Sequence, residues 1–447
     1  MTTANGLIVG LMAGLFLLFG YMGVPVAFSL LAGVLIGAMF TQVTFASLMT
    51  QLFNGIDAEA LMAIPFFLLV GELMTSANVV VRIANLSQAL VGHIRGGLAQ
   101  VVTVFSMFFS GMSGSSSADV AVLSRTMAKP MAQEGYEPAF VAALIAAAAT
   151  IANLVPPSIM AVVYGAIGNV SIAGLFLGGI VPGFMIGFGL MIYCYFFGPP
   201  GHRRPRSSFG QLGEATKAAG LPLVIPVILL GGILTGWFTP TEAGVIAITY
   251  ILVVVIPILN LGHIRHLPRD FAHAGLIYSL PLITIGAASA FGWMLAYLRG
   301  PIVVSGWISS IAGDNPYKIM FALVALFTIV GDFIEPVPCI VIFMPIVASL
   351  TDTGGINSVH MGVVLIVTLA FGLITPPYGL ALLMASKFVG VRFSQALVAS
   401  LSIYVVFFVT IAVCIFFPDA VLYLPRHVFP ESIGCFKSPT GAGYICP

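Results

Sequence analysis

Two short polar stretches interrupt long apolar runs and carry the residues best suited to bind a ligand. The first reads Ser-Gly-Met-Ser-Gly-Ser-Ser-Ser-Ala-Asp at 110–119, and the second reads Gly-Asp-Phe-Ile-Glu-Pro-Val-Pro at 331–338. Serine hydroxyls and backbone amides can hold a carboxylate, whereas hydroxyl and carbonyl oxygens are the ligands of hard cations such as sodium. Polar groups inside an apolar run need partners, so both stretches are candidate binding sites.

Four carboxylates along the chain have more than one interpretation. Asp119 falls on the first turn of a helix that leaves the first stretch, where it can cap the helix or bind an ion. Asp332 and Glu335 lie within a buried stretch and can couple protons, neutralise sodium or cap the next helix. Glu242 follows Thr-Pro-Thr at 239–241 and has either a capping or a functional role.

A proline pair follows each polar stretch. Residues 153–158 read Asn-Leu-Val-Pro-Pro-Ser, and residues 373–378 read Leu-Ile-Thr-Pro-Pro-Tyr. A proline inside a helix costs about 3 kcal/mol or more, because it lacks an N–H and clashes with the preceding turn. Both apolar segments must therefore break at their pairs. The freed carbonyl oxygens suit a hard cation, and the N-termini of half-helices favour anions. One pair alone would indicate only a kink, but two matching pairs predict two related sites.

The elements that position these residues are helices in a membrane. Of the 447 residues, 60% are hydrophobic and only 7% are charged, against about 25% charged in an average soluble domain. Apolar runs of about 18 residues or more indicate membrane-spanning helices. The two interrupted stretches, 97–132 and 317–350, predict re-entrant helical hairpins. The predicted spans lie near 6–22, 24–41, 60–78, 138–168, 173–197, 221–238, 242–260, 274–298, 360–386 and 395–417. We therefore expect an all-α polytopic membrane protein, and the net charge of +1 favours no nucleic-acid partner.

The order of these elements predicts two inverted repeats, each with about five spans and one re-entrant hairpin. The expected divisions are residues 1–200 with hairpin 97–132 and broken helix 138–168, a cytoplasmic linker at 201–220, residues 221–425 with hairpin 317–350 and broken helix 360–386, and a polar C-terminal tail at 426–447. Cys435 and Cys446 lie in this tail and could pair if it is periplasmic.

The distribution of Lys and Arg predicts the orientation. The polar segment 198–217 carries several basic residues and is expected in the cytoplasm. Both termini are then expected in the periplasm of a bacterial inner membrane. The first hairpin enters from the cytoplasm and the second from the periplasm. Inverted repeats with discontinuous helices are typical of secondary transporters, whose sites lie between the repeats. An enzyme would need a clustered catalytic constellation, and a passive channel would not need two occluding hairpins.

Several further motifs resemble one family, the large membrane subunit of tripartite ATP-independent periplasmic (TRAP) transporters. This is the M subunit, a DctM-like family within the ion transporter superfamily, and the resemblance covers about residues 6–425. The motifs are Gly-Val-Pro-Val-Ala-Phe-Ser-Leu at 23–30, Gly-His-Ile-Arg-Gly-Gly-Leu at 92–98, Ser-Gly-Ser-Ser-Ser-Ala at 113–118, Pro-Pro-Ser at 156–158, Gly-Gly-Ile-Val-Pro-Gly at 178–183, Thr-Glu-Ala at 241–243 and Thr-Pro-Pro at 375–377.

The resemblance implies sodium-driven uptake of a small organic acid by an elevator motion of the hairpins and broken helices. It also implies two protein partners, a small four-span membrane subunit (Q) and a periplasmic substrate-binding protein (P), besides membrane lipid. Sodium is the expected coupling ion, and no enzyme activity or organic cofactor is expected. The sequence departs from the family at Glu335, where Asp is usual, and at Asp332, where an acidic residue is not.

These expectations assign residues to three sites. The expected ligands of a first sodium ion are Ser113, Ser115 and Ser116 with carbonyl groups of Asn153, Val155 and Pro156. The expected ligands of a second sodium ion, largely through backbone carbonyls, are Gly331, Glu335, Gly372, Thr375 and Pro376. The expected substrate-binding residues are Ser115, Ser116, Ser117, Ser158 and Thr375. The alternative is a sodium/dicarboxylate symporter of the same superfamily that works without a binding protein.

Overall fold

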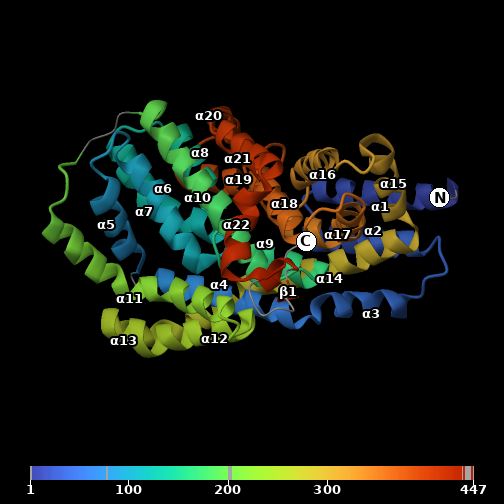
Figure 1. Ribbon diagram of the computed structural model, residues 1–447, viewed down its shortest axis with the longest axis horizontal. Coiled ribbons are helices and arrows are strands. Elements are labelled where there is room, and N and C mark those ends of the chain that lie inside the picture. The colour runs from blue at the N-terminus through green and yellow to red at the C-terminus, as the bar shows by residue number, and fades with distance from the viewer. Residues whose placement is uncertain (1–2, 77–78, 200–203, 435, 438–443, 446–447) are drawn as a thin grey trace.

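The computed structural model describes residues 3–76, 79–199, 204–434, 436–437 and 444–445. Within these residues the chain is helical apart from two short strands near its end (Figure 1). The elements of the first half are α1 (Thr3–Tyr21), α2 (Val26–Ala38), α3 (Phe45–Ile56), η1 (Glu59–Met62), α4 (Ala63–Ser76), α5 (Val79–Val91), α6 (Leu98–Ser113), α7 (Ser116–Gln133), α8 (Pro138–Ala149), η2 (Thr150–Asn153), α9 (Ile159–Gly168) and α10 (Ile172–Phe196).

The second half begins with a long helix and ends with the two strands. Its elements are α11 (Phe209–Leu234), α12 (Pro240–Tyr250), η3 (Ile251–Val255), α13 (Ile256–Leu259), η4 (Leu261–His266), α14 (Leu267–Tyr297), α15 (Gly300–Ala312), α16 (Pro316–Gly331), α17 (Pro336–Thr353), α18 (Ser358–Gly372), α19 (Leu380–Val389), α20 (Phe393–Ser400), α21 (Tyr404–Phe416), α22 (Pro418–Val428), η5 (Pro430–Ile433), β1 (Phe436–Lys437) and β2 (Tyr444–Ile445). The strands pair antiparallel, with Phe436 opposite Ile445.

Many of these helices are apolar enough to lie in a bilayer. Five described helices are long enough to cross one, and three more spans result if each strongly bent pair of helices is taken together. The prolines at 156–157 and 376–377 interrupt their helices, because α8 and η2 end before the first pair and α18 ends before the second. The predicted all-helical membrane architecture with broken helices is therefore confirmed.

Two helical hairpins lie on opposite sides of α9, α18 and α19 (Figure 1). The helices α6 and α7 pack together, as do α16 and α17, and each hairpin also packs against the broken helix that follows it. The two halves of the chain also pack on each other in a reciprocal way, which we call the exchanged packing. The short helix after the first break, α9, packs on α17 of the second hairpin, and the corresponding helix after the second break, α19, packs on α7 of the first hairpin.

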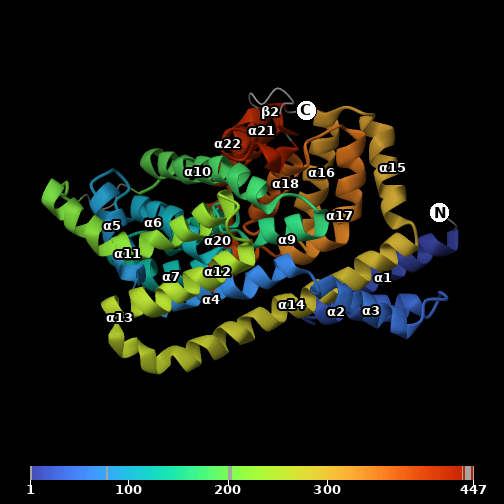
Figure 2. The same ribbon diagram turned by 60° about the horizontal axis from the view of Figure 1, so that its bottom comes forward.

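A layer of helices built around the 31-residue α14 packs against the hairpins. The helix α14 contacts α2, α3, α4 and α17. In Figure 2, α13 and the first part of α14 form the lower left edge of the molecule, with α4 and α12 just above them and α16 and α17 higher on the right. The helices α5 and α11 pack together at the end of the molecule far from α1 (Figure 1).

The segment expected to be a linker is partly helical. The helix α11 begins at Phe209, inside the segment 201–220, because Ser208 and Gln211 form a capping box. The Ser208 hydroxyl accepts from the Gln211 N–H at 3.2 Å, and the Gln211 side chain accepts from the Ser208 N–H at 2.9 Å. Two satisfied N–H groups start a helix where composition alone indicates a loop.

Other boundaries differ for similar local reasons. The span expected at 395–417 is divided by a turn at 401–403 into α20 and α21. The tail expected from 426 begins within α22, which continues to Val428. The hypothesis of a Cys435–Cys446 pair concerns residues that lie outside the described part of the chain.

Candidate functional site

The tip of the first hairpin lies directly on the first helix break. Gly114 ends α6 with φ +61°, and its carbonyl accepts from the Ile159 N–H at 3.4 Å. A Cβ atom at Gly114 would lie 2.2 Å from the carbonyl oxygen of Pro157. Only glycine combines this positive φ with such a close backbone approach. The tip and the break therefore touch through their main chains.

The first break is held by hydrogen bonds and by its neighbour α10. The Ser158 hydroxyl caps α9 by accepting from the Ala161 N–H at 3.2 Å, and it donates to the carbonyl of Asn153. A Cβ atom at Gly179 of α10 would lie 2.4 Å from the Leu154 carbonyl oxygen. The Pro156–Pro157 peptide bond is cis, as is the Pro376–Pro377 bond of the second break.

Asp119 belongs to the first tip rather than to the cap of α7. Its side chain is fully buried and accepts a hydrogen bond from the Ser113 hydroxyl, across the turn of the hairpin. Its Oδ2 atom is buried without a hydrogen-bond partner among the described residues. Of its two interpretations, capping is therefore not supported, since its partner is a side chain of α6.

The second tip contacts the second break in a related way. A Cβ atom at Gly372 would lie 3.4 Å from the carbonyl group of Gly331, so the two backbones are in contact. The Thr375 hydroxyl donates to Asp332 Oδ1 at 2.5 Å, and the Tyr378 N–H donates to the Asp332 carbonyl at 3.2 Å. Asp332 is thus the carboxylate beside the expected second cation site.

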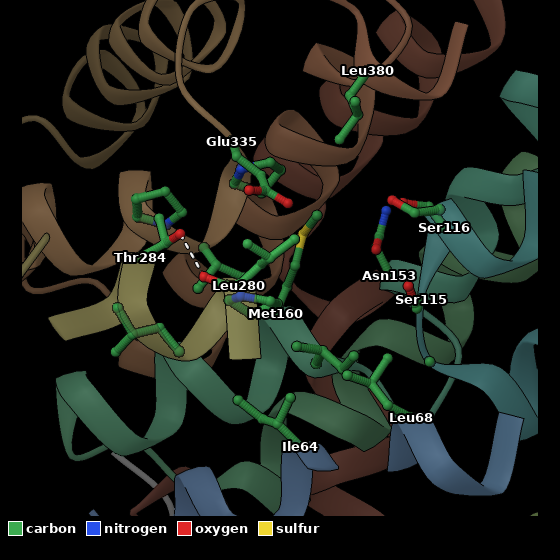
Figure 3. Close-up of a pocket in the computed structure, with 18 of the residues that line it drawn as sticks. Ile64, Leu68, Ser115, Ser116, Asn153, Met160, Leu280, Thr284, Glu335 and Leu380 are labelled. Atoms are coloured by element: carbon green, nitrogen blue, oxygen red, sulfur yellow. Dashed lines mark hydrogen bonds between the residues drawn. The ribbon is translucent and has the colours of Figure 1, made fainter. Parts of the chain in front are cut away.

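A cavity of about 330 Å³ lies between the two tips. Its polar residues come from the first tip, the first break, α14 and the second tip, and the rest of the wall is apolar. Figure 3 shows Ser115, Ser116 and Asn153 on one side and Glu335 on the other. Of the described residues that line it, Glu335 alone has an acidic or basic side chain. Ligand pockets have volumes of roughly 300–1,000 Å³, so the cavity fits a small molecule.

Only some of the predicted site residues line the cavity, and the others lie at the tips and the breaks. Those that line the cavity are Ser115, Ser116, Ser117, Asn153 and Glu335. Ser113 contacts Asp119, and Ser158 caps α9. Thr375 contacts Asp332, whereas the remaining backbone positions lie at the breaks and the second tip, namely Val155, Pro156, Gly331, Gly372 and Pro376. The expected substrate residues Ser158 and Thr375 are not among the cavity lining.

Part of the cavity wall was not expected from the sequence. It consists of α4 and α14 residues that look like ordinary span residues: Ile64, Leu68, Ile277, Leu280, Pro281, Thr284 and Ile285. The Thr284 hydroxyl donates to the Leu280 carbonyl of its own helix at 2.7 Å. No local signal marks these residues, because only tertiary packing brings them to the tips.

Two other acidic residues have structural partners. Glu242 forms a capping box with Thr239 at the start of α12, and its side chain accepts from the Thr239 N–H at 2.8 Å. The capping interpretation of Glu242 is therefore confirmed. Glu72 of α4 pairs with His273 of α14 at 3.0 Å, which links two of the supporting helices. Across the described residues, no three His, Cys, Asp or Glu side chains group as a metal site.

Comparison with known proteins decides the family. Residues 13–420 match the model of the DctM component of tripartite ATP-independent periplasmic transporters. The chain belongs to this family. It is 35% identical over 414 residues to the sialic acid TRAP transporter large permease protein SiaM of Vibrio cholerae, covering 91% of this chain and 96% of that protein.

Two further relatives carry other substrates in their names. The C4-dicarboxylate TRAP transporter large permease protein DctM of Pseudomonas aeruginosa is 34% identical, with 89% of this chain and 93% of that protein covered. The ectoine/5-hydroxyectoine TRAP transporter large permease protein UehC of Ruegeria pomeroyi is 30% identical, with 92% of this chain and 97% of that protein covered. The chain is thus a TRAP large permease and a multi-pass inner-membrane protein, and membership implies a small permease and a periplasmic binding protein as partners.

A solved structure supports the fold alone. The YdaH transporter of Alcanivorax borkumensis, described as having an unusual topology, superposes with a TM-score of 0.57 at 14% sequence identity. The match covers 85% of this chain and 88% of that one. The helical architecture described above is therefore that of a known transporter fold.

Proposed function

We propose that this permease imports a small organic acid by sodium-driven symport. The observation that carries the proposal is the shared cavity between two tip–break contacts, each rich in hydroxyl and carbonyl oxygens. Hard cations prefer oxygen ligands, and irregular backbone at membrane depth is kept where it lines a site. The substrates named for the relatives are a sialic acid, a C4-dicarboxylate and ectoines, all of which carry a carboxylate.

Two sodium ions would lie where the tips meet the breaks. The first would bind the hydroxyls of the first tip, the Ser113 side chain foremost, with carbonyls between Asn153 and Pro156. The second would bind carbonyls of Gly331, Gly372 and Pro376 with the Thr375 hydroxyl. Asp332 supports this second assignment, since its carboxylate lies 2.5 Å from Thr375 Oγ1 and adds a negative charge beside the cation.

Transport would proceed by an elevator motion. The moving body comprises the two hairpins and the broken helices. Each hairpin contacts a helix of the other half, α17 contacting α9 and α7 contacting α19. The stationary body includes α4, α12 and α14, which line one side of the molecule (Figure 2). The halves would be inverted in the membrane, with both termini in the periplasm. The binding protein would deliver the substrate, and the small four-span subunit would hold the stationary body in the bilayer.

The test is uptake into proteoliposomes that contain the permease with its small subunit and its binding protein. Loaded binding protein and an inward sodium gradient are expected to drive accumulation of substrate. Collapsing the gradient with a sodium ionophore is expected to stop it. Accumulation that continues at equal sodium on both sides, or that needs no binding protein, would overturn the proposal.

A further inference from the structure

One polar group on the cavity wall has no partner within the described chain. Asn153 is 3% exposed, lines the cavity, and its side-chain Nδ2 atom is buried without a hydrogen-bond partner among the described residues. A buried donor without an acceptor costs roughly 1–3 kcal/mol. Such a group is expected to find its acceptor in a ligand.

The start of α7 faces the same space. Gly114, Ser115, Ser116 and Ser117 all line the cavity, and the 18-residue helix begins at Ser116. The first N–H groups of a helix have no partner within it and attract anions. Figure 3 shows the Asn153 amide next to Ser116. The carboxylate of Asp119 is turned to Ser113 instead and does not line the cavity.

The opposite end of the cavity carries an acidic side chain instead of hydrogen-bond donors. Glu335 enters from the second tip on the other side (Figure 3), and no basic side chain lines the cavity among the described residues. Its carboxylate does not cap α17, and it forms no ion pair with any residue that the structure describes. A second anionic group of a substrate would meet this carboxylate at short range in a low dielectric, where like charges repel strongly. A hydroxyl or ammonium group would instead donate to it.

We propose that Asn153 and the N-terminus of α7 hold the single carboxylate of the substrate, and that Glu335 selects a hydrogen-bond donor at its far end. The preferred substrates are monocarboxylates with a hydroxyl or ammonium group, rather than dicarboxylates. This inference rests on the proposed function and narrows it to a substrate class. It uses the Asn153 side chain, whereas the proposed sodium site uses its backbone carbonyl.

Binding to the detergent-solubilised complex of the permease and its small subunit tests this proposal. The probes are sialic acid, a hydroxylated monocarboxylate; ectoine, a zwitterion; and succinate, a dicarboxylate. In sodium buffer, isothermal titration calorimetry is expected to show sialic acid or ectoine binding at least about tenfold more tightly than succinate. The variant Glu335→Gln is expected to narrow that ratio through tighter binding of succinate.

Substitution of Asn153 tests the carboxylate end. Asn153→Leu is expected to raise the dissociation constant of the preferred probe by about tenfold or more, because a charge-assisted hydrogen bond is lost. Asn153→Asp keeps the size but adds a negative charge, so it is expected to weaken binding further than Asn153→Leu. A purely structural role would not produce that order. Asn85→Leu, at an exposed position on α5, is the matched control and is expected to bind as the wild type does.

Several outcomes would overturn the inference. They are tightest binding of succinate, an unchanged ratio in Glu335→Gln, unchanged binding in Asn153→Leu, and no binding of any probe to the wild-type complex. If Asn153→Leu does not assemble, Asn153→Gln displaces the amide by one methylene and is expected to show the same loss. The proposed function is judged separately by sodium-driven uptake, so a failure of the substrate class leaves it standing.

Discussion

Gly114 is the residue through which the first hairpin tip meets the first break. It combines a φ of +61° with a Cβ position 2.2 Å from the Pro157 carbonyl oxygen. Gly135, in the turn between α7 and α8, also has a positive φ, +80°, but a Cβ there would meet nothing within 4 Å. The two glycines thus separate the effect of backbone strain from the effect of tip–break contact.

We expect Gly114→Ala to impair sodium binding and Gly135→Ala not to. Both changes place a side chain in the left-handed region, which costs about 1–3 kcal/mol of stability. Only Gly114→Ala also pushes the tip away from the carbonyls of the break. Sodium-dependent thermal stabilisation of the purified complex measures the difference. Equal sodium responses in the two variants would contradict the contact described here.

The second tip shows which assignments depend on residue-level geometry. The sequence places Asp332 and Glu335 three positions apart, and both were candidates for the cation site. The turn between α16 and α17 sends them to different places, Asp332 to Thr375 and Glu335 to the cavity. Spacing along the chain could not separate them, because the direction of the turn depends on contacts with the second break.

At the scale of elements, the broken helices depend on how their second halves begin. The helix α9 starts at a Ser158 cap, and α10 starts at a Ser171 cap, and both hydroxyls accept an N–H at 3.2 Å. Ser158 additionally donates to the Asn153 carbonyl at the break. The caps are alike, but only one of them belongs to the candidate site.

We expect Ser158→Ala and Ser171→Ala to lower the free energy of unfolding by a similar amount, about 1 kcal/mol. Only Ser158→Ala is expected to raise the sodium concentration needed for half-maximal uptake, because the Asn153 carbonyl loses its positioning partner. Thermal melts and uptake assays on the same preparations compare the two. If Ser171→Ala raised the sodium concentration for half-maximal uptake equally, loss of a helix cap alone would explain the change, and the prediction would fail.

Elements were predictable from the sequence where one residue type dominates the local energy. The proline pairs break their helices for a reason that needs no tertiary contact. Short helices such as α3, α5 and α15 lie outside the predicted spans, because they are too short to cross a bilayer. Their sequences also contain no pattern that indicates which helices they pack against. The start of α11 at Phe209 could have been predicted from Ser208 and Gln211, a capping-box pair that a composition-based division overlooks.

At the scale of the whole molecule, the proposed elevator motion separates contacts that persist from contacts that change. The α9–α17 contact would lie within the proposed moving body, and there a Cβ on Gly168 would be 3.0 Å from Met344 Sδ. The α14–α17 contact would join the proposed moving and stationary bodies, and there a Cβ on Gly292 would be 3.4 Å from the Ile342 Cα. Both contacts involve the same hairpin helix, so they form a matched pair.

We expect a disulfide between Gly292→Cys and Ile342→Cys to stop uptake, and one between Gly168→Cys and Met344→Cys to leave it near the wild-type rate. The background would have its native cysteines replaced. Oxidation followed by uptake measurements, with and without a reductant, tests both pairs. Full transport by the oxidised first pair would exclude sliding of α17 along α14.

The architecture and the family were accessible from motifs spread along the chain, but the cavity was not. Its walls combine α4, the first tip and break, α14 and the second tip, which lie far apart in sequence. Ser115, Ser116 and Ser117, the serines of the first tip assigned to the substrate site from the sequence, all line the cavity. The apolar side, from Ile64 to Ile285, depends on how α4 and α14 pass the hairpins, which no local pattern encodes.

The exchanged packing of α9 on α17 and α19 on α7 has a consequence for how the protein can diversify. A two-fold symmetric pair of separate chains with this exchange would be obliged to carry identical residues at both sites. Here both halves belong to one polypeptide, so the residues of each site can change independently while the exchanged packing is preserved. The first site has Ser113 with Asp119, and the second has Thr375 with Asp332. A new substrate preference can therefore arise by altering one tip while the other keeps the residues of its proposed ion site.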